Sequence, residues 1–254
     1  MTDSYAFQPL PESIPGLEVF LQRLGVNYQD SDFSQLREQV RRAIELKVDF
    51  SAPPPRHWED AIIEQAIPRN AHVLDLGCGT GELLARLIDK RNCTVQGVEE
   101  NEESALEAIC RGIPVYQGDI SRVCAKLVDN AFDFAILENT LQTLRNPIDT
   151  LTDMLRVAQT SIVSFPNFAH WSVRLAFSIG GRMPVTASLP NTWYNTPNIH
   201  LCSITDFIDW TQRQNIDILS AHVLVEGKVE PLQADRHLHN ITAEQALFFI
   251  RRRP

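Results

Sequence analysis

Residues 72–88, HVLDLGCGTGELLARLI, contain three glycines at alternate positions. An apolar run typical of a buried strand leads into Gly77, Gly79 and Gly81, and a run with helical spacing follows. Ligands of parallel α/β sheets bind beyond the carboxyl ends of the strands, where glycine lets the backbone approach a ligand and adopt positive φ. A tight turn without a ligand is the alternative, but three alternating glycines exceed what a turn requires. The stretch therefore predicts a ligand-binding loop between a first strand and a first helix.

The sequence after residue 72 continues to alternate between strand-like and helix-like runs. Strands are predicted at 72–76, 94–98, 114–117, 132–137 and 161–165, and helices at 82–90, 102–111, 121–128, 147–157 and 204–214. Two later apolar runs, 216–225 and 245–250, are expected to pair as a hairpin at the sheet edge. The pattern predicts an α/β fold with a doubly wound, mostly parallel, seven-stranded sheet of Rossmann-like type.

The first 69 residues contain few strand signals. An amphipathic helix is predicted at 33–48, and Pro53, Pro54 and Pro55 then form a stiff break. Apolar residues from Trp58 to Ile67 indicate a second helix. We expect a helical extension over residues 1–69, followed by the main domain at 70–254. A mobile linker is the alternative.

Composition narrows the range of functions. The formal net charge of −9 argues against general affinity for nucleic acid or anionic membranes, because both are polyanionic surfaces. No apolar run approaches the roughly 20 residues that span a bilayer, and the start has no signal-peptide pattern. Five scattered cysteines without a CxxC pair suggest reduced thiols rather than a disulfide framework or a zinc site. We therefore expect a cytoplasmic protein without a structural metal.

Three carboxylates near strand ends indicate which ligand the loop binds. The spacing GxGxG differs from the GxGxxG of dinucleotide sites, and Asp75 before it suits a cationic amino group better than a pyrophosphate. Glu99, at the end of the second strand, can accept hydrogen bonds from ribose hydroxyls. Asp119 can accept from an adenine amino group, with Ile120 against the ring.

An amino acid, a ribose and an adenine without phosphate make up S-adenosylmethionine or S-adenosylhomocysteine. The predicted cofactor-binding residues are Asp75, Gly77, Cys78, Gly79, Gly81, Glu99, Asp119 and Ile120. An NAD-binding oxidoreductase is the competing interpretation. A site that no longer binds anything is disfavoured, since three carboxylates at one mouth would repel each other without a ligand.

These residues resemble the signature of the class I S-adenosylmethionine-dependent methyltransferases, and longer motifs resemble one family more closely. NTLQTLRNP (139–147), SFPNFAHW (164–171), RMPVT (182–186) and WYNTPNIHLC (193–202) are similar to the pattern of the MetW family, methionine-biosynthesis protein W. The resemblance implies S-adenosylmethionine binding, a role in methionine biosynthesis and a homoserine O-acyltransferase as partner.

The second half of the chain supplies the candidates for contact with a substrate or partner. Aromatic and amide side chains are unusually dense there, as in pockets and partner surfaces. The candidates are Asn139, Gln142, Asn167, His170, Trp193, Tyr194 and His200, although helix capping or a core position explains such residues equally well.

No general base stands out, and Glu138 and His170 are the nearest candidates. Two hypotheses remain. The chain is either a weakly catalytic or non-catalytic partner of an acyltransferase, or an active methyltransferase acting on a small molecule.

Overall fold

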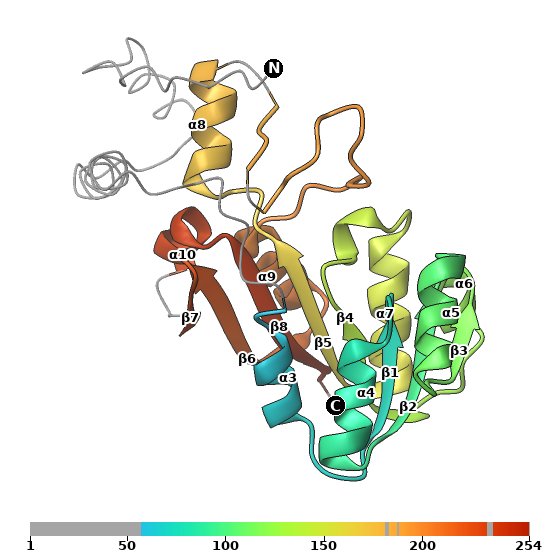
Figure 1. Ribbon diagram of the computed structural model, residues 1–254. Helices are drawn as coiled ribbons and strands as arrows, with labels where there is room; N and C mark the ends of the chain where they lie inside the picture. Colours follow the sequence, from blue (N-terminus) through green and yellow to red (C-terminus); the bar gives the residue numbers. More distant parts are fainter. Residues whose placement is uncertain (1–56, 181–182, 187, 233–235, 254) are drawn as a thin grey trace. The chain divides into compact units, whose positions relative to one another are not determined.

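The computed structural model describes residues 57–180, 183–186, 188–232 and 236–253. An eight-stranded sheet in the order β3-β2-β1-β4-β5-β8-β6-β7 organises them (Figure 1). The strands are β1 (His72–Leu76), β2 (Thr94–Glu99), β3 (Val115–Gln117), β4 (Phe132–Leu137), β5 (Ala158–Pro166), β6 (Ile216–Val225), β7 (Lys228–Pro231) and β8 (Gln245–Arg252). The first five pair in parallel and the last three antiparallel. The predicted α/β class and mostly parallel sheet are confirmed.

The carboxyl-terminal strands differ from the prediction in number and order. The sheet has eight strands rather than seven, because β7 adds a short outer strand. The runs 216–225 and 245–250 do pair, but β8 lies between β5 and β6 and is an interior strand. The hairpin at the edge is β6–β7. All six residues from Gln245 to Ile250 are buried, as expected for a strand covered on both faces.

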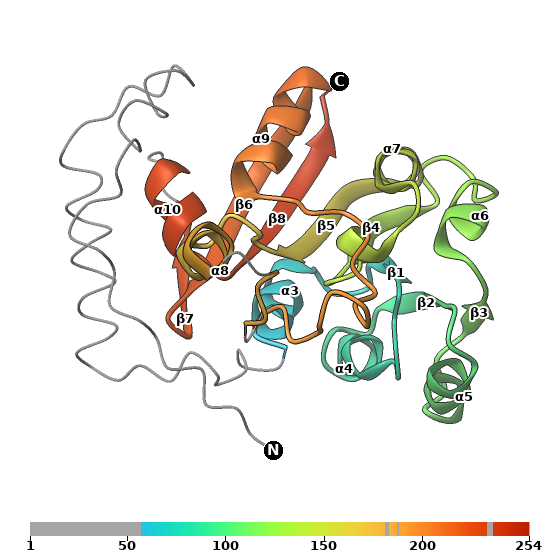
Figure 2. The ribbon, with the colours of Figure 1, turned by 90° about the horizontal axis from the view of Figure 1, so that it is seen from above.

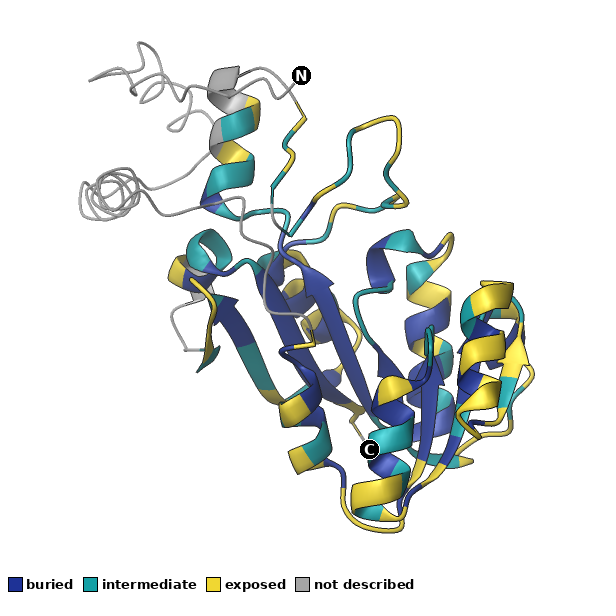
Figure 3. Ribbon diagram, in the orientation of Figure 1, coloured by how far each residue is buried: buried dark blue, intermediate teal, exposed yellow. Residues whose placement is uncertain are grey.

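Helices cover both faces of the sheet (Figure 2). One face packs against α3 (Asp60–Ala66), α4 (Glu82–Arg91) and α5 (Glu102–Cys110). The other packs against α6 (Ile120–Cys124), α7 (Pro147–Val157) and α9 (Ile204–Arg213). Burial follows the same layers, with buried strands between half-exposed helices (Figure 3). Alternate residues of β1 serve the two cores: Val73 faces the α3–α4 side, and Leu74 and Leu76 face the α7–α9 side.

Local sequence explains where several helices begin. Pro147 occupies the first turn of α7, and Asn101 caps α5 by accepting from the Ser104 N–H. Ser203 and Asp206 form a reciprocal capping box at α9. These interactions fix the helix starts close to the predicted ones.

The helix α3 packs directly on the sheet. Trp58, Ile63 and Ile67 are buried in the same core as Val73, and the Trp58 indole donates to Gln245 Oε1 at 2.6 Å. We therefore propose that this helix belongs with the domain that follows it. The helix expected at 33–48 and the three prolines lie outside the described residues.

Between β5 and α9 the chain leaves the sheet at the carboxyl end of β5 (Figure 1). It forms α8 (Trp171–Gly180), which the sequence pattern did not predict, and residues 183–186 and 188–203 before α9 contain no helix or strand. The remaining elements are the 3₁₀ turn η1 (Leu141–Thr143) after β4 and α10 (Arg236–Thr242) before β8. None of the helices in the described part of the chain combines the length and the apolar character needed to cross a bilayer.

Candidate functional site

The glycine loop joins β1 to α4 at the carboxyl edge of the sheet. Gly77, Gly79 and Gly81 have φ of 89°, 53° and 77°, a region that residues with side chains rarely adopt. The Gly77 and Cys78 N–H groups donate to the Val98 carbonyl at 2.8 and 3.1 Å, which fastens the loop to β2. A Cβ on Gly81 would lie 3.0 Å from Ala108 and Ile113, whereas one on Gly79 would meet nothing within 4 Å. The two ends of the loop are therefore held against neighbouring residues, while the space beside Gly79 is free.

Glu99 holds the open part of this loop. Its Oε2 accepts from the Gly79 N–H and its Oε1 from the Asn101 N–H, both at 2.8 Å. Each carboxylate oxygen can accept a further hydrogen bond. The predicted contact of Glu99 with ribose hydroxyls is therefore compatible with its role in the loop.

The surroundings of the Asp75 carboxyl group disfavour its ionised form. The residue is buried, and burial, followed by the charges of Asp60 and Glu99, raises its pKa to about 7. A carboxyl group in that state gains strongly from a cation.

Three further members of the predicted cofactor set have defined surroundings. The Cys78 side chain lies under the loop against β2, where a Cβ on Gly97 would approach its Sγ to 2.6 Å. Burial raises the pKa of this thiol to about 12, so the thiol stays protonated at neutral pH and serves as a packing group. Asp119 caps α6 by accepting from the Arg122 N–H at 3.1 Å, and Ile120 is buried beside it.

An acidic group near the start of the glycine loop consists of the buried residues Glu59, Asp60 and Asp75 and the partly buried Glu138. The pKa of Glu138 is raised to about 9 by burial and then by the charges of Glu59, Asp60 and Asp75. Burial is also the main cause of the raised pKa of Glu59 and of Asp60. These mutual charge effects show that the four carboxyls lie in one electrostatic environment.

Among the described residues, Arg86 and His57 form ion pairs with this acidic group. Arg86 bonds to Asp60, and it also bonds to Glu64 at 2.6 Å, so its charge is shared. His57 lies 3.8 Å from Asp60 and from Glu138 and is half exposed. The group therefore carries more potential negative charge than its neighbours neutralise, an arrangement suited to a cationic ligand.

The residues from α3 were missed by sequence reasoning. Trp58, Glu59 and Asp60 begin a helix that precedes the glycine loop in the chain, and no motif spacing links them to it. His57, Asp60 and Glu138 also offer ligand atoms within 4.8 Å of one another, a grouping that the sequence did not predict. The one sequence feature that could have indicated them is an acidic pair, Glu59 and Asp60, at the start of the helix directly before the first strand.

Neither candidate base is suited to removing a proton near neutral pH. Glu138, with a pKa of about 9, is protonated in the ligand-free protein. Burial, and then the charge of Arg174, lowers the pKa of His170 to about 4. His170 Nδ1 lies 2.7 Å from the Ser172 hydroxyl, at the start of α8. Assignment of either residue as a base remains a hypothesis.

Asn139 and Gln142 lie in the turn after β4, next to the glycine loop. Asn139 Nδ2 donates to Glu59 Oε1 at 2.8 Å. Gln142 is buried, and its Nε2 donates to the Asn139 carbonyl at 2.7 Å. The Gln142 carbonyl accepts from the N–H groups of Ile199 and His200, at 2.8 and 3.0 Å. Both side chains thus organise the turn.

The other predicted contact residues separate into buried and exposed ones. Asn167 is buried and its amide donates to the carbonyls of Asn240 and Ala243 at 3.0 and 2.8 Å, so it joins the end of β5 to α10. Trp193 and Tyr194 are 73% and 75% exposed. His200 Nε2 lies 3.4 Å from the Arg145 carbonyl. The structure brings His200 to the turn after β4 and leaves the two aromatic residues open to solvent.

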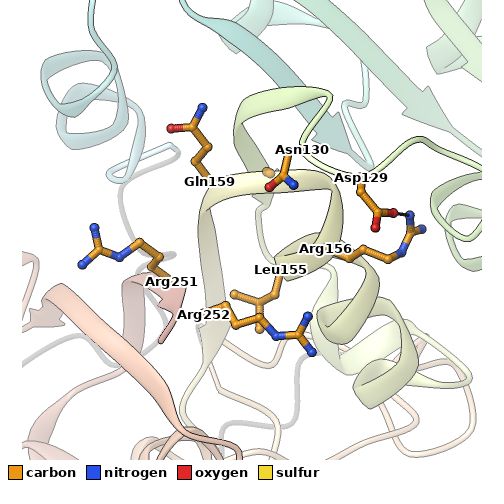
Figure 4. A pocket seen from close by; sticks show the side chains of 8 residues that line it. Asp129, Asn130, Leu155, Arg156, Gln159, Arg251 and Arg252 are labelled. Atoms are coloured by element: carbon orange, nitrogen blue, oxygen red, sulfur yellow. Dashed lines mark hydrogen bonds and ion pairs between the residues drawn. The ribbon is translucent and has the colours of Figure 1, made fainter. Parts of the chain in front are cut away.

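A shallow pocket of about 390 Å³ lies at the opposite, amino-terminal edge of β4 and β5 (Figure 4). It is lined by Asp129, Asn130, Leu155, Arg156, Ala158, Gln159, Arg251 and Arg252. Arg156 is bonded to Asp129 at 2.6 Å, as the dashed line shows. We assign no role to this pocket, because it is separated from the glycine loop by the length of the strands.

Comparison with known proteins identifies the family. The family described as methionine biosynthesis protein MetW matches residues 58–250. The chain belongs to the MetW family. The match begins at Trp58, so the MetW pattern includes α3 as well as the sheet. A curated relative from Rhodopirellula baltica, "Bifunctional methionine biosynthesis protein MetXA/MetW", is 37% identical over 169 residues. That alignment covers 63% of this MetW chain and 27% of the relative, so the chain spans about a quarter of the relative's length.

Solved structures show which fold the MetW chain shares. A S-adenosylmethionine-dependent methyltransferase from Thermotoga maritima, described as a possible histamine N-methyltransferase, aligns with a TM-score of 0.56 and 16% identity over 86% of this chain and 96% of its own. A TehB-like methyltransferase from Corynebacterium glutamicum aligns with a TM-score of 0.51 and 15% identity, over 89% and 100%. At these identities the likeness shows the fold, and the predicted Rossmann-like methyltransferase fold is confirmed.

Proposed function

We propose that this MetW-family chain binds S-adenosylmethionine or S-adenosylhomocysteine at the glycine loop and supports a homoserine O-acyltransferase. The observation that carries the ligand proposal is the buried acidic group beside the open Gly79. Within the part of the chain that the structure describes, Arg86 is the arginine bonded to this group of four carboxyls, through Asp60, and its charge is shared with Glu64. A ligand with a cationic amino-acid end would supply the missing positive charge.

The parts of such a ligand match residues along the carboxyl edge of the sheet. Asp75 would receive the amino group, and Glu99 the ribose hydroxyls. Asp119 and Ile120 would lie at the adenine. The open space at Gly79 would let the ligand approach the backbone closely. NAD is disfavoured because its pyrophosphate would face this acidic surface.

The partner proposal rests on the relative from Rhodopirellula baltica. Its description joins MetXA and MetW in one chain, and fusion holds two domains at high effective concentration. In the present chain, the described residues 183–186 and 188–201 form a segment that exposes Met183, Val185, Trp193, Tyr194, Ile199 and Leu201. Exposed apolar side chains gathered in one segment are typical of a protein interface. We therefore propose this segment as the contact with the acyltransferase.

An active methyltransferase is the second candidate, favoured by the intact loop and by the fold of its structural neighbours. The cofactor would supply the electrophilic methyl group. The protein's contribution would be to align an acceptor in line with it, an effect of about 7–11 kcal/mol at most. Because neither Glu138 nor His170 is suited to act as a base near neutral pH, an acceptor that needs no deprotonation, such as a thiolate or a neutral amine, is favoured.

Equilibrium dialysis with labelled S-adenosylmethionine tests the ligand assignment. Asp75→Asn should weaken binding by about tenfold or more, because the amide keeps the shape but removes the charge. Glu99→Gln should weaken it less, while Asp89→Asn, on α4, is the control. Equal losses for the first two variants would mean that the amino group and ribose are wrongly assigned.

Co-purification with a homoserine O-acyltransferase tests the partner assignment. The double variant Trp193→Ala, Tyr194→Ala should lose the partner and keep wild-type ligand affinity. Tyr116→Ala, on β3, is a matched control because Tyr116 is also exposed, at 54%. Retention of the partner by the double variant would exclude these side chains from the interface.

A further inference from the structure

Glu59 is the most buried carboxylate in the acidic group, with 1% of the residue exposed. It lies immediately before α3, far in sequence from the glycine loop. Its Oε1 accepts from Asn139 Nδ2 at 2.8 Å, and the nearby Ser164 hydroxyl favours the charged form of the carboxyl group, which lowers its pKa. A buried carboxylate is costly unless it is well hydrogen-bonded. These neutral neighbours therefore hold the Glu59 carboxyl group in its position.

Asn139 is held in an unusual conformation at the other end of this contact. Its φ is 47°, in the left-handed region, which costs a residue with a side chain about 1 kcal/mol or more. Its N–H donates to Ser164 Oγ at 3.0 Å and to the Ser164 carbonyl at 3.1 Å. Glu59, Asn139 and Ser164 therefore form a closed network that joins α3, the turn after β4 and the end of β5.

The residues on either side of Asn139 face the ligand loop. Glu138 places its carboxyl in the acidic group beside Asp75. Thr140 lies so close to the loop that a Cβ on Gly77 would be 2.9 Å from its Oγ1. Thr140 Oγ1 in turn donates to the Glu138 carbonyl at 2.8 Å. A shift at Asn139 would therefore move both neighbours relative to the glycine loop.

We propose that Glu59 is a positioning residue of the ligand site, which acts by holding Asn139 so that Glu138 and Thr140 are correctly placed at the glycine loop. The helix before the sheet thereby becomes part of the binding site. The inference rests on the proposed S-adenosylmethionine site. It differs from a direct role, in which the Glu59 charge itself would attract the ligand.

Substitution by an isosteric neutral residue separates these two roles. In Glu59→Gln the side-chain carbonyl can still accept from Asn139, and the new amide can donate to Ser164. Binding of S-adenosylhomocysteine, measured by calorimetry, should stay within about threefold of wild type. Glu59→Ala should weaken it by about tenfold or more. Gln65→Ala, at an exposed position of the same helix, is the control and should bind like wild type.

Asn139→Gly provides a test that does not depend on the folding of the alanine variant. Glycine adopts the left-handed conformation freely but lacks the amide that Glu59 accepts from. It should weaken binding as much as Glu59→Ala does, and the double variant should be no weaker than either single one.

The outcomes separate this inference from the proposed ligand site. Equal, large losses for Glu59→Gln and Glu59→Ala would show a direct charge contact and overturn the positioning role. Wild-type affinity in Glu59→Ala or in Asn139→Gly would overturn it as well. Failure of the wild-type protein to bind S-adenosylhomocysteine or S-adenosylmethionine would reject the proposed function, and this inference with it.

Discussion

The three glycines of the loop after β1 share positive φ but differ in what a side chain would meet. At Gly81 a Cβ would press against Ala108 and Ile113, whereas at Gly79 it would enter open space. The glycine pattern alone predicted a ligand loop, but it did not distinguish these positions. The difference comes from the packing of α5, which lies some 30 residues later in the chain.

Gly81→Ala and Gly79→Ala should therefore have different effects. We expect Gly81→Ala to lower the free energy of unfolding by about 2–4 kcal/mol, from backbone strain and the clash together. Gly79→Ala should cost about 1 kcal/mol, from strain alone, and should mainly reduce ligand affinity. Denaturant unfolding and calorimetric titration of both variants measure the two effects. Equal destabilisation would contradict the packing difference.

The pKa of Glu138 leads to a prediction for the ligand-free protein. Because this pKa is raised to about 9, the folded state keeps a proton that the unfolded state releases above about pH 4.5. The free energy of unfolding should fall as the pH rises from about 4.5 to about 9, and Glu138→Gln should reduce that fall. At pH 8 the variant should melt about 2–4 °C above wild type.

Thermal melts between pH 5 and pH 9 measure this difference, with Glu107→Gln, on the surface of α5, as the control. A variant that melts below wild type at pH 8 would mean that the carboxyl group has stabilising contacts that outweigh its burial.

At the scale of elements, local pattern predicted most of the sheet. Strands β1 to β5 begin and end within a few residues of their predicted limits, because apolar runs and glycine or proline breaks are local features. The place of β8 between β5 and β6 was missed, since strand order depends on contacts between distant residues. The helix α8 was missed because the density of rings and prolines around it resembled a pocket-lining loop.

The role of Asn167 shows the same limit. Its motif suggested contact with a substrate or partner, but its amide bonds to two carbonyls that lie more than 70 residues away in the sequence. Asn167→Ala should lower the free energy of unfolding by about 2–4 kcal/mol, because it leaves those carbonyls unpaired. Asn195→Ala, at an exposed position, is the control. Loss of ligand affinity without loss of stability would restore the original interpretation of Asn167.

At the scale of the whole molecule, the sheet brings distant carboxyls to one place. Strand β1 supplies Asp75 just before the glycine loop, the turn after β4 supplies Glu138, and Glu59 and Asp60 lie at the start of α3. Asp75 was named from the sequence because it precedes the first glycine, and Glu138 because it follows the fourth strand. The two residues of α3 were not, because only the folded chain shows that this helix lies beside the loop.

This arrangement predicts that ligand binding depends on pH. With a pKa of about 7, Asp75 is mostly protonated at pH 6, and a cationic amino group favours its ionised form. Affinity for S-adenosylhomocysteine should therefore rise from pH 6 to pH 7.5, by up to about tenfold per pH unit, with release of a proton. Asp75→Asn should flatten the profile. Wild-type affinity that falls over this range would contradict the assignment of Asp75.

We propose that the glycine loop and the acidic group beside it bind a cationic adenosyl amino acid. Calorimetric titration of the wild-type protein with S-adenosylmethionine, S-adenosylhomocysteine and NAD at pH 7.5 tests it most directly. We predict saturable binding of the first two at micromolar concentrations and no binding of NAD. Binding of NAD alone, or of none of the three, would contradict the claim.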